Sequence, residues 1–187
     1  MDLILINEVD FGVKIALKYA TSENFTGKPV YRANARCYLH TKAAECLSKA
    51  VTLAAALGLS FVVYDAYRPT EAQWKLWEHT PDPNFLADPA KGSPHSRGVA
   101  IDLTLTDAGG APLDMGTPFD AFKPLSHHGR TDIPAEAQKN RLLLMGIMST
   151  AGWDFYRNEW WHYQLFNSRE YKLWSDKEAG TDIMPEA

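Results

Sequence analysis

The stretch GSPHSRGVAIDLTL, residues 92–105, decides the fold. In its second half, apolar residues alternate with other residue types at a period of two, which is typical of a strand. The opposite face carries Asp102, and an ionised carboxylate among strand-forming apolar residues is costly unless it is paired or coordinated. Asp102 therefore needs a partner. The apolar face of the expected strand carries four residues: Val99, Ile101, Leu103 and Leu105.

His95 lies seven residues before Asp102 in the same stretch. In one straight strand, at about 3.3 Å per residue, the two side chains would lie more than ~20 Å apart and on opposite faces, so they could not share an ion. Gly98, which follows Ser96 and Arg97, is a position where the chain can turn. We therefore expect a bend at Gly98 that brings His95 over the face carrying Asp102.

A second group of candidates lies in EWWHY, residues 159–163. Glu159 and His162 are three residues apart, a separation that meets on one face in a helical turn but diverges in a straight strand. We therefore expect a turn or bulge at Trp160–Trp161. With the histidine and aspartate of the first stretch, His162 gives two imidazoles and a carboxylate. This set suits zinc, because catalytic zinc sites commonly have three protein ligands and a water molecule in the fourth position. A nearby glutamate would take the proton of that water.

The spacings by themselves leave structural alternatives open. The rival of a metal site is a buried ion pair between Asp102 and either Arg97 or Arg68. Arg68 is in turn as well placed for an ion pair with Asp65 as for catalysis. Two further groups supply only two metal ligands each: His127 with His128, and Cys37 with His40.

The rest of the chain predicts one α+β domain over residues 1–187, with a central, mainly antiparallel sheet flanked by helices. Thr41 and Gly58 bound the first expected helix, and Thr70 with Gln73 forms a capping box for the second. We expect helices over 41–58, 70–79 and 134–152, strands over 59–64, 99–105 and 159–166, and long loops over 80–94 and 111–132.

Composition excludes several classes of function. The 187 residues carry a formal charge of -4 with scattered Lys and Arg, so nothing supports nucleic-acid binding. No stretch approaches the ~20 apolar residues of a spanning helix, and the N-terminal segment is a poor signal peptide. Cys37 and Cys46, on a chain without export signals, do not indicate a disulfide framework. We expect a cytoplasmic protein with a small-molecule partner and no nucleic-acid or membrane partner.

Taken together, GSPHSRGVAIDLTL and EWWHY closely resemble the zinc-dependent D-alanyl-D-alanine dipeptidases of the VanX type, in the wider DD-peptidase and hedgehog-like superfamily. The resemblance covers nearly the whole chain in the family's order. One departure is Pro94, where the family more often has a small or polar residue; it biases Ser93 towards an extended conformation. The other matching stretches are YDAYRP (64–69), LKYATSENFTGKPVY (17–31), FDAFKPLSHH (119–128) and NRLLLMGIM (140–148).

Carried over position by position, the resemblance implies the roles of nine residues. Glu159 would be the general base and acid, and Arg68 would stabilise the oxyanion of the attacked peptide. Asp120 would receive the ammonium group of the substrate. The resemblance further implies that Ser93 and Tyr19 line the substrate pocket, that Asp65 holds Arg68, and that one Zn²⁺ per chain is bound by His95, Asp102 and His162.

The activity that the resemblance implies is hydrolysis of the dipeptide D-Ala-D-Ala to two D-alanines. One alternative is a D,D- or L,D-carboxypeptidase or endopeptidase that acts on peptidoglycan stem peptides. Another, of a different class, is a hedgehog-like, zinc-containing binding module without catalysis. A binding module needs neither Glu159 nor Arg68, so their joint presence favours an enzyme. The sequence leaves open whether identical subunits form a homo-oligomer.

Overall fold

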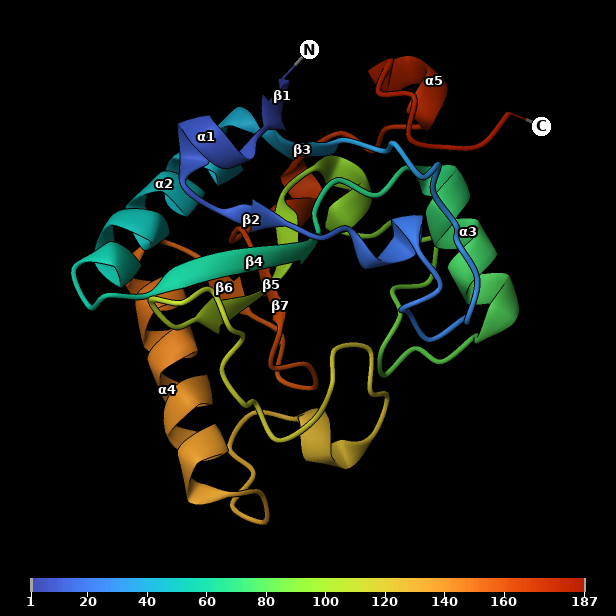
Figure 1. The fold of residues 1–187 in the computed structure, drawn as a ribbon. Helices are drawn as coiled ribbons and strands as arrows, with labels where there is room; N and C mark the ends of the chain where they lie inside the picture. Colours follow the sequence, from blue (N-terminus) through green and yellow to red (C-terminus); the bar gives the residue numbers. More distant parts are fainter. Residues whose placement is uncertain (1, 187) are drawn as a thin grey trace.

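The computed structural model describes residues 2–186 and is built around a five-stranded sheet, whose strands can be followed in Figure 1. The β2–β4 pair is parallel and the other three pairs are antiparallel, so the predicted mainly antiparallel sheet is confirmed. Strands β1 (Leu3–Ile6) and β3 (Cys37–His40) form a separate antiparallel pair. Across the five-stranded sheet the order is β2 (Lys14–Ile15), β4 (Ser60–Asp65), β5 (Ala100–Thr106), β7 (His162–Gln164) and β6 (Asp154–Phe155).

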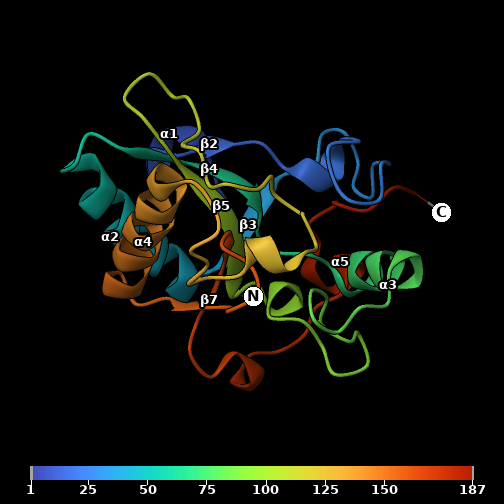
Figure 2. The same ribbon diagram turned by 90° about the horizontal axis from the view of Figure 1, so that it is seen from below.

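The helices divide between two sides of the molecule. Helices α2 (Thr41–Ala55) and α4 (Ala135–Thr150) lie side by side, whereas α3 (Thr70–His79) and α5 (Asp176–Ala179) lie on the other side (Figure 2). The expected α+β class is confirmed. The remaining short elements are α1 (Glu8–Phe11) and four 3₁₀ turns, η1 (Lys18–Ala20), η2 (His95–Arg97), η3 (Pro124–Ser126) and η4 (Ser168–Glu170).

The main core fills the space between the sheet and helices α2 and α4. The apolar spacing of α2 predicts its buried face, because residues at i, i+3, i+4 and i+7 lie on one side of a helix. All seven residues of β5 are buried, so the strand is covered on both faces. Asp102 therefore lies in the interior. The buried residues of α2 are Ala43, Ala44, Leu47, Ala50 and Ala54.

Several predicted helix ends are wrong. His40, not Thr41, caps α2: its imidazole Nδ1 accepts a hydrogen bond from the backbone N–H of Lys42 at 3.2 Å. This helix ends at Ala55, three residues before Gly58. The capping box at α3 is absent, because its first turn has no side-chain cap.

The predicted strand 159–166 is also too long, because β7 covers only His162–Gln164. The residues before it form a turn, which is what the side chains of Glu159 and His162 need in order to lie on one face. In residues 2–186, no helix combines the length and the hydropathy needed to cross a membrane.

Candidate metal centre and active site

Three strands of the sheet place ionisable residues in one row. Asp65 of β4 is the register partner of Asp102 of β5, and Asp102 is the partner of His162 of β7. The β4–β5 register shifts between Val63 and Asp65, which brings Asp65 opposite Asp102. Directly opposed residues have Cβ atoms about 4.5–5.5 Å apart, so the side chains of a row interact.

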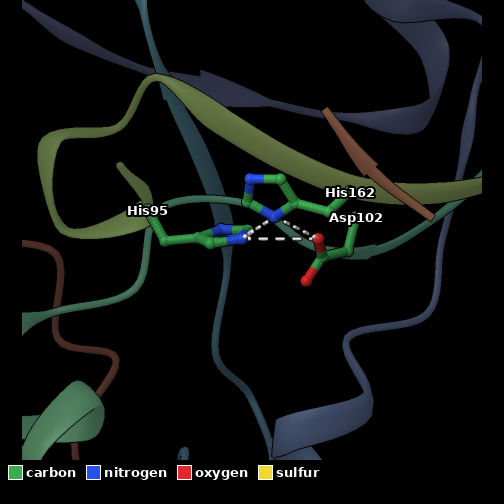
Figure 3. A group of neighbouring side chains, drawn as sticks. All are labelled: His95, Asp102 and His162. Atoms are coloured by element: carbon green, nitrogen blue, oxygen red, sulfur yellow. Dashed lines mark hydrogen bonds and ion pairs between the residues drawn. The ribbon is translucent and has the colours of Figure 1, made fainter. Parts of the chain in front are cut away.

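The bend predicted at Gly98 is confirmed. The chain makes the 3₁₀ turn η2 and then passes through Gly98 in the left-handed conformation, with φ of +69°. The Gly98 N–H donates to the His95 carbonyl at 2.9 Å. As a result, the His95 ring points toward the Asp102 carboxylate, with 3.3 Å between His95 Nε2 and Asp102 Oδ1 (Figure 3).

The turn predicted at Trp160–Trp161 is also present. The His162 N–H points back to the Glu159 carbonyl at 3.4 Å, and Glu159 Oε2 lies 3.9 Å from His162 Nδ1. Both tryptophans are buried, so bulk water is kept away from this side of the turn. Burial raises the pKa of Glu159 well above its ordinary value, and the negative charges of Asp102 and Asp120 raise it further.

His95, Asp102 and His162 present three acceptor atoms to one point (Figure 3). His95 Nδ1 lies 2.7 Å from the Ala66 carbonyl and His162 Nε2 lies 3.2 Å from Gln164 Oε1, so each ring has an oxygen acceptor for a proton on its outer nitrogen. The inner nitrogens, His95 Nε2 and His162 Nδ1, are then lone pairs 3.1 Å apart. Both face a carboxylate oxygen, and His162 Nδ1 is 3.1 Å from Asp102 Oδ1.

Such a cluster of acceptors requires a cation. Two imidazole nitrogens and one carboxylate oxygen, each ring held from behind by an oxygen acceptor, match the donor set and the outer hydrogen bonds of protein zinc sites. The residues present therefore fit zinc. Within residues 2–186, this is the group of three ligands that the structure brings together, and neither His127 with His128 nor Cys37 with His40 belongs to it.

Asp102 also forms the ion pair with Arg68 that was the structural alternative to a metal site. Both can exist together because the two oxygens of Asp102 face different partners. Oδ1 faces the two histidines, whereas Oδ2 lies 3.5 Å from Arg68 Nη2. The other rival, Arg97, instead contacts the Tyr171 carbonyl.

The guanidinium of Arg68 is held on several sides. Its Nε donates to Asp65 Oδ2 at 2.9 Å, a pairing that the family resemblance implies, and its Nη1 donates to Gln73 Oε1 at 2.9 Å. Its Cζ lies 4.9 Å from the ring centroid of Tyr19. Arg68 is thus a buried cation with a fixed orientation beside the histidine cluster.

Asp120 lies in a buried polar pocket formed by residues distant in sequence. Its Oδ1 accepts from the Tyr19 hydroxyl at 3.2 Å and its Oδ2 from the Phe25 N–H at 3.4 Å. Burial raises the pKa of Asp120 to about 8, and the charge of Asp102 adds to the effect. A carboxyl group in this state gains most from a cationic partner.

One cavity of about 380 Å³ joins these groups. Ser93 lies at its wall, where its hydroxyl accepts from the His95 N–H at 3.2 Å. Pro94, the residue between them, has φ of -58° and ψ of -33° and begins the η2 turn. The sequence-predicted residues that line this cavity are Tyr19, Arg68, Ser93, His95, Asp102, Asp120, Glu159 and His162.

Sequence reasoning missed two residues that hold the site. Gln73, expected at a helix cap, turns inward instead: it accepts from Arg68 and donates to the Ala87 carbonyl at 2.7 Å. Tyr31 donates its hydroxyl to Asp65 Oδ1 at 2.9 Å. The signal for Gln73 is its position three residues before the apolar Leu76, on the buried face of α3.

A family model described as D-Ala-D-Ala dipeptidase matches residues 1–176. The chain belongs to the M15 family of peptidases. A protein from Escherichia coli K12 named D-alanyl-D-alanine dipeptidase is 47% identical over 165 residues, which cover 88% of this chain and 85% of that relative. A protein of the same name from Enterococcus faecium is 38% identical over 181 residues, 86% of this chain and 89% of the relative.

One solved structure that resembles this M15 peptidase is more distant in sequence. VanYB in complex with D-Alanine-D-Alanine has a TM-score of 0.47 and 16% sequence identity, with 72% of this chain and 75% of that chain covered.

Proposed function

We propose that this chain is a zinc-dependent dipeptidase that hydrolyses D-Ala-D-Ala to two D-alanines. The observation that carries the proposal is the convergence of three acceptor atoms, from His95, Asp102 and His162, beside a buried glutamate in one cavity. The family model and the names of the relatives support the choice of substrate.

In this proposal, His95, Asp102 and His162 hold one zinc ion per chain. When bound, zinc supplies a Lewis acid that makes a water molecule nucleophilic near neutral pH. Glu159 accepts the proton of the attacking water and delivers it to the leaving amine. Its raised pKa suits this double role, because the group must both take and give a proton near the working pH.

Two further charges orient the substrate. Arg68 directs its guanidinium at the oxygen that becomes negative during attack, while Asp65 and Gln73 keep that guanidinium in place. Asp120 receives the ammonium group of the dipeptide, which lowers the raised pKa of the carboxyl group on binding. Tyr19 orients Asp120, and Ser93 lines the same cavity. Binding of the free ammonium by Asp120 excludes substrates that are extended on the amino side, and together with a cavity closed on the carboxyl side it would limit the substrate to dipeptides.

The decisive experiment measures D-alanine release from D-Ala-D-Ala by the purified protein. Removal of the metal by a chelator should abolish turnover, and added zinc should restore it with one ion per chain. Glu159→Gln should lower turnover by roughly 10²–10⁴-fold while zinc stays bound, because it removes a proton acceptor and no ligand. Glu170→Gln, at an exposed glutamate, is the matched control. Full turnover by Glu159→Gln would exclude this glutamate as the base.

The same assay separates the alternatives. Cleavage of a stem pentapeptide at a rate equal to that of the dipeptide would indicate a carboxypeptidase. One zinc per chain with no hydrolysis of any peptide would indicate a binding module. The cytoplasmic location stays a prediction, which cell fractionation tests. Whether identical subunits associate stays open, and analytical ultracentrifugation would decide it.

A further inference from the structure

The segment that carries Asp120, residues 115–127, contains only the short η3 turn as regular structure. One side chain from outside it ties its two ends together. Arg141 of α4 donates Nε to the Met115 carbonyl at 2.7 Å, and Nη1 to the carbonyls of Leu125 at 2.9 Å and His127 at 3.0 Å. Asp120 lies between these points, with φ of +58°. Residues other than glycine rarely adopt this backbone conformation unless the surrounding structure holds them in it.

Arg141 is buried, with 4% of its surface exposed, and the cavity of the site does not include it among its lining residues. Each hydrogen bond that its guanidinium makes to the described residues ends on a backbone carbonyl or on the Thr117 hydroxyl, not on a carboxylate. Burial lowers the pKa of Arg141 to about 10. A buried cation without an ionic partner is costly, so its hydrogen bonds to this segment are a strong constraint on the backbone.

The same network reaches the turn that carries Glu159. Trp160 donates its indole Nε1 to Thr117 Oγ1 at 2.9 Å and its backbone N–H to the Ser126 carbonyl at 3.1 Å. The hydroxyls of Thr117 and Ser126 lie 3.1 Å apart. A continuous chain of hydrogen bonds thus runs from Arg141 through residues 115–127 to the residue next to Glu159.

We propose that Arg141 is a positioning residue of the active site, which sets the Asp120 carboxylate and the Glu159 turn relative to each other by clamping residues 115–127. This role rests on the proposed dipeptidase function. An arginine suits it, because a planar guanidinium presents several donors in a rigid fork and can reach both ends of the segment, whereas a lysine ammonium is a single point charge. Arg141 acts through Asp120 and Glu159 and touches no substrate.

The test is a double-mutant cycle of Arg141→Lys with Asp120→Asn. It compares kcat/KM for D-Ala-D-Ala with kcat/KM for propionyl-D-alanine, the same molecule with the ammonium group replaced by hydrogen. Arg141→Lys should lower kcat/KM for the dipeptide by about tenfold or more, since a displacement of ~1 Å costs up to ~10²-fold. The loss for propionyl-D-alanine should be smaller, and in the Asp120→Asn background the two substrates should lose equally. Zinc content should not change.

Asn140→Ala is the matched control, because the neighbouring Asn140 donates to the Asp114 carbonyl at 2.8 Å, just outside the clamped segment. It should lower thermal stability without changing the ratio of the two substrates. If Arg141→Lys loses activity on both substrates by one factor, in step with its folded fraction, the role is only structural and the proposal is wrong.

If Arg141→Lys does not fold, a second variant tests the hydrogen bonds that connect residues 115–127 to the Glu159 turn. Trp160→Phe removes the indole donor to Thr117 and should lower kcat for both substrates alike, with KM little changed. Unchanged kcat in Trp160→Phe would overturn the link to Glu159. A wild-type protein that loads one zinc but cleaves neither substrate would refute the proposed function itself, and the positioning role with it.

Discussion

Replacing Gly98 by alanine tests the turn that brings His95 to Asp102. A φ of +69° costs a residue with a Cβ about 1–2 kcal/mol. The new Cβ would also overlap Leu3 Cδ2 and lie 3.1 Å from the backbone nitrogen of His40, and such overpacking costs about 1–3 kcal/mol. That nitrogen donates to the Gly98 carbonyl at 2.7 Å, so the two backbones cannot separate without losing the bond.

The sum is a loss of about 2–5 kcal/mol in the free energy of unfolding, measured by urea titration of the metal-free protein. Gly58→Ala is the matched control, because Gly58 has φ of +71° and a methyl group added there would meet nothing within 4 Å, so only the conformational cost of about 1–2 kcal/mol applies. Each kcal/mol corresponds to about 2–4 °C in Tm for a chain of this size. Equal losses in the two variants would refute the close packing at Gly98.

Buried polar groups lead to three further predictions. Because the pKa of Asp120 rises from 3.8 in the unfolded chain to about 8 in the fold, the folded protein holds the extra proton between these values. The free energy of unfolding of the metal-free protein should therefore fall as the pH rises from 3.8 to about 8, and Asp120→Asn should remove this part of the slope; parallel pH curves would contradict it. Gln73→Leu leaves Arg68 without one acceptor and should lower kcat/KM about tenfold or more, whereas Gln73→Glu keeps the acceptor and should lose less; equal kinetics for Gln73→Leu and the wild type would exclude this role. Tyr31→Phe removes a donor to the buried Asp65 and should cost about 1–3 kcal/mol in thermal unfolding, and an unchanged Tm would show that the bond contributes nothing.

Much of the site was predictable because its signals are local. A carboxylate at Asp102, within an apolar strand pattern, indicates a paired or coordinated group. In a straight strand His95 would lie too far from Asp102, so the chain must bend at Gly98. The three-residue spacing of Glu159 and His162 requires a turn in the same way. The structure contains both features.

The helix-cap errors show where local reasoning ends. Gln73 matches the spacing of a capping box, yet its amide accepts a hydrogen bond from the buried guanidinium of Arg68. A buried donor without an acceptor costs more free energy than a solvent-accessible backbone group without a cap. His40, not Thr41, caps α2, because Thr41 is already the first residue of the helix, where its backbone N–H and its hydroxyl both donate to the Asp2 carbonyl. In each case, a partner distant in sequence changes the local preference.

The sequence by itself determined the α+β class, the buried face of α2, the strand that carries Asp102 and, through its resemblance, the family. Only the tertiary structure decided that Asp65, Asp102 and His162 form one row and that Arg141 ties the Asp120 segment to the Glu159 turn. The physical reason is that periodicity within an element shows which side chains are buried. Strand register and the direction of long side chains depend on contacts between elements, which no single stretch of sequence contains.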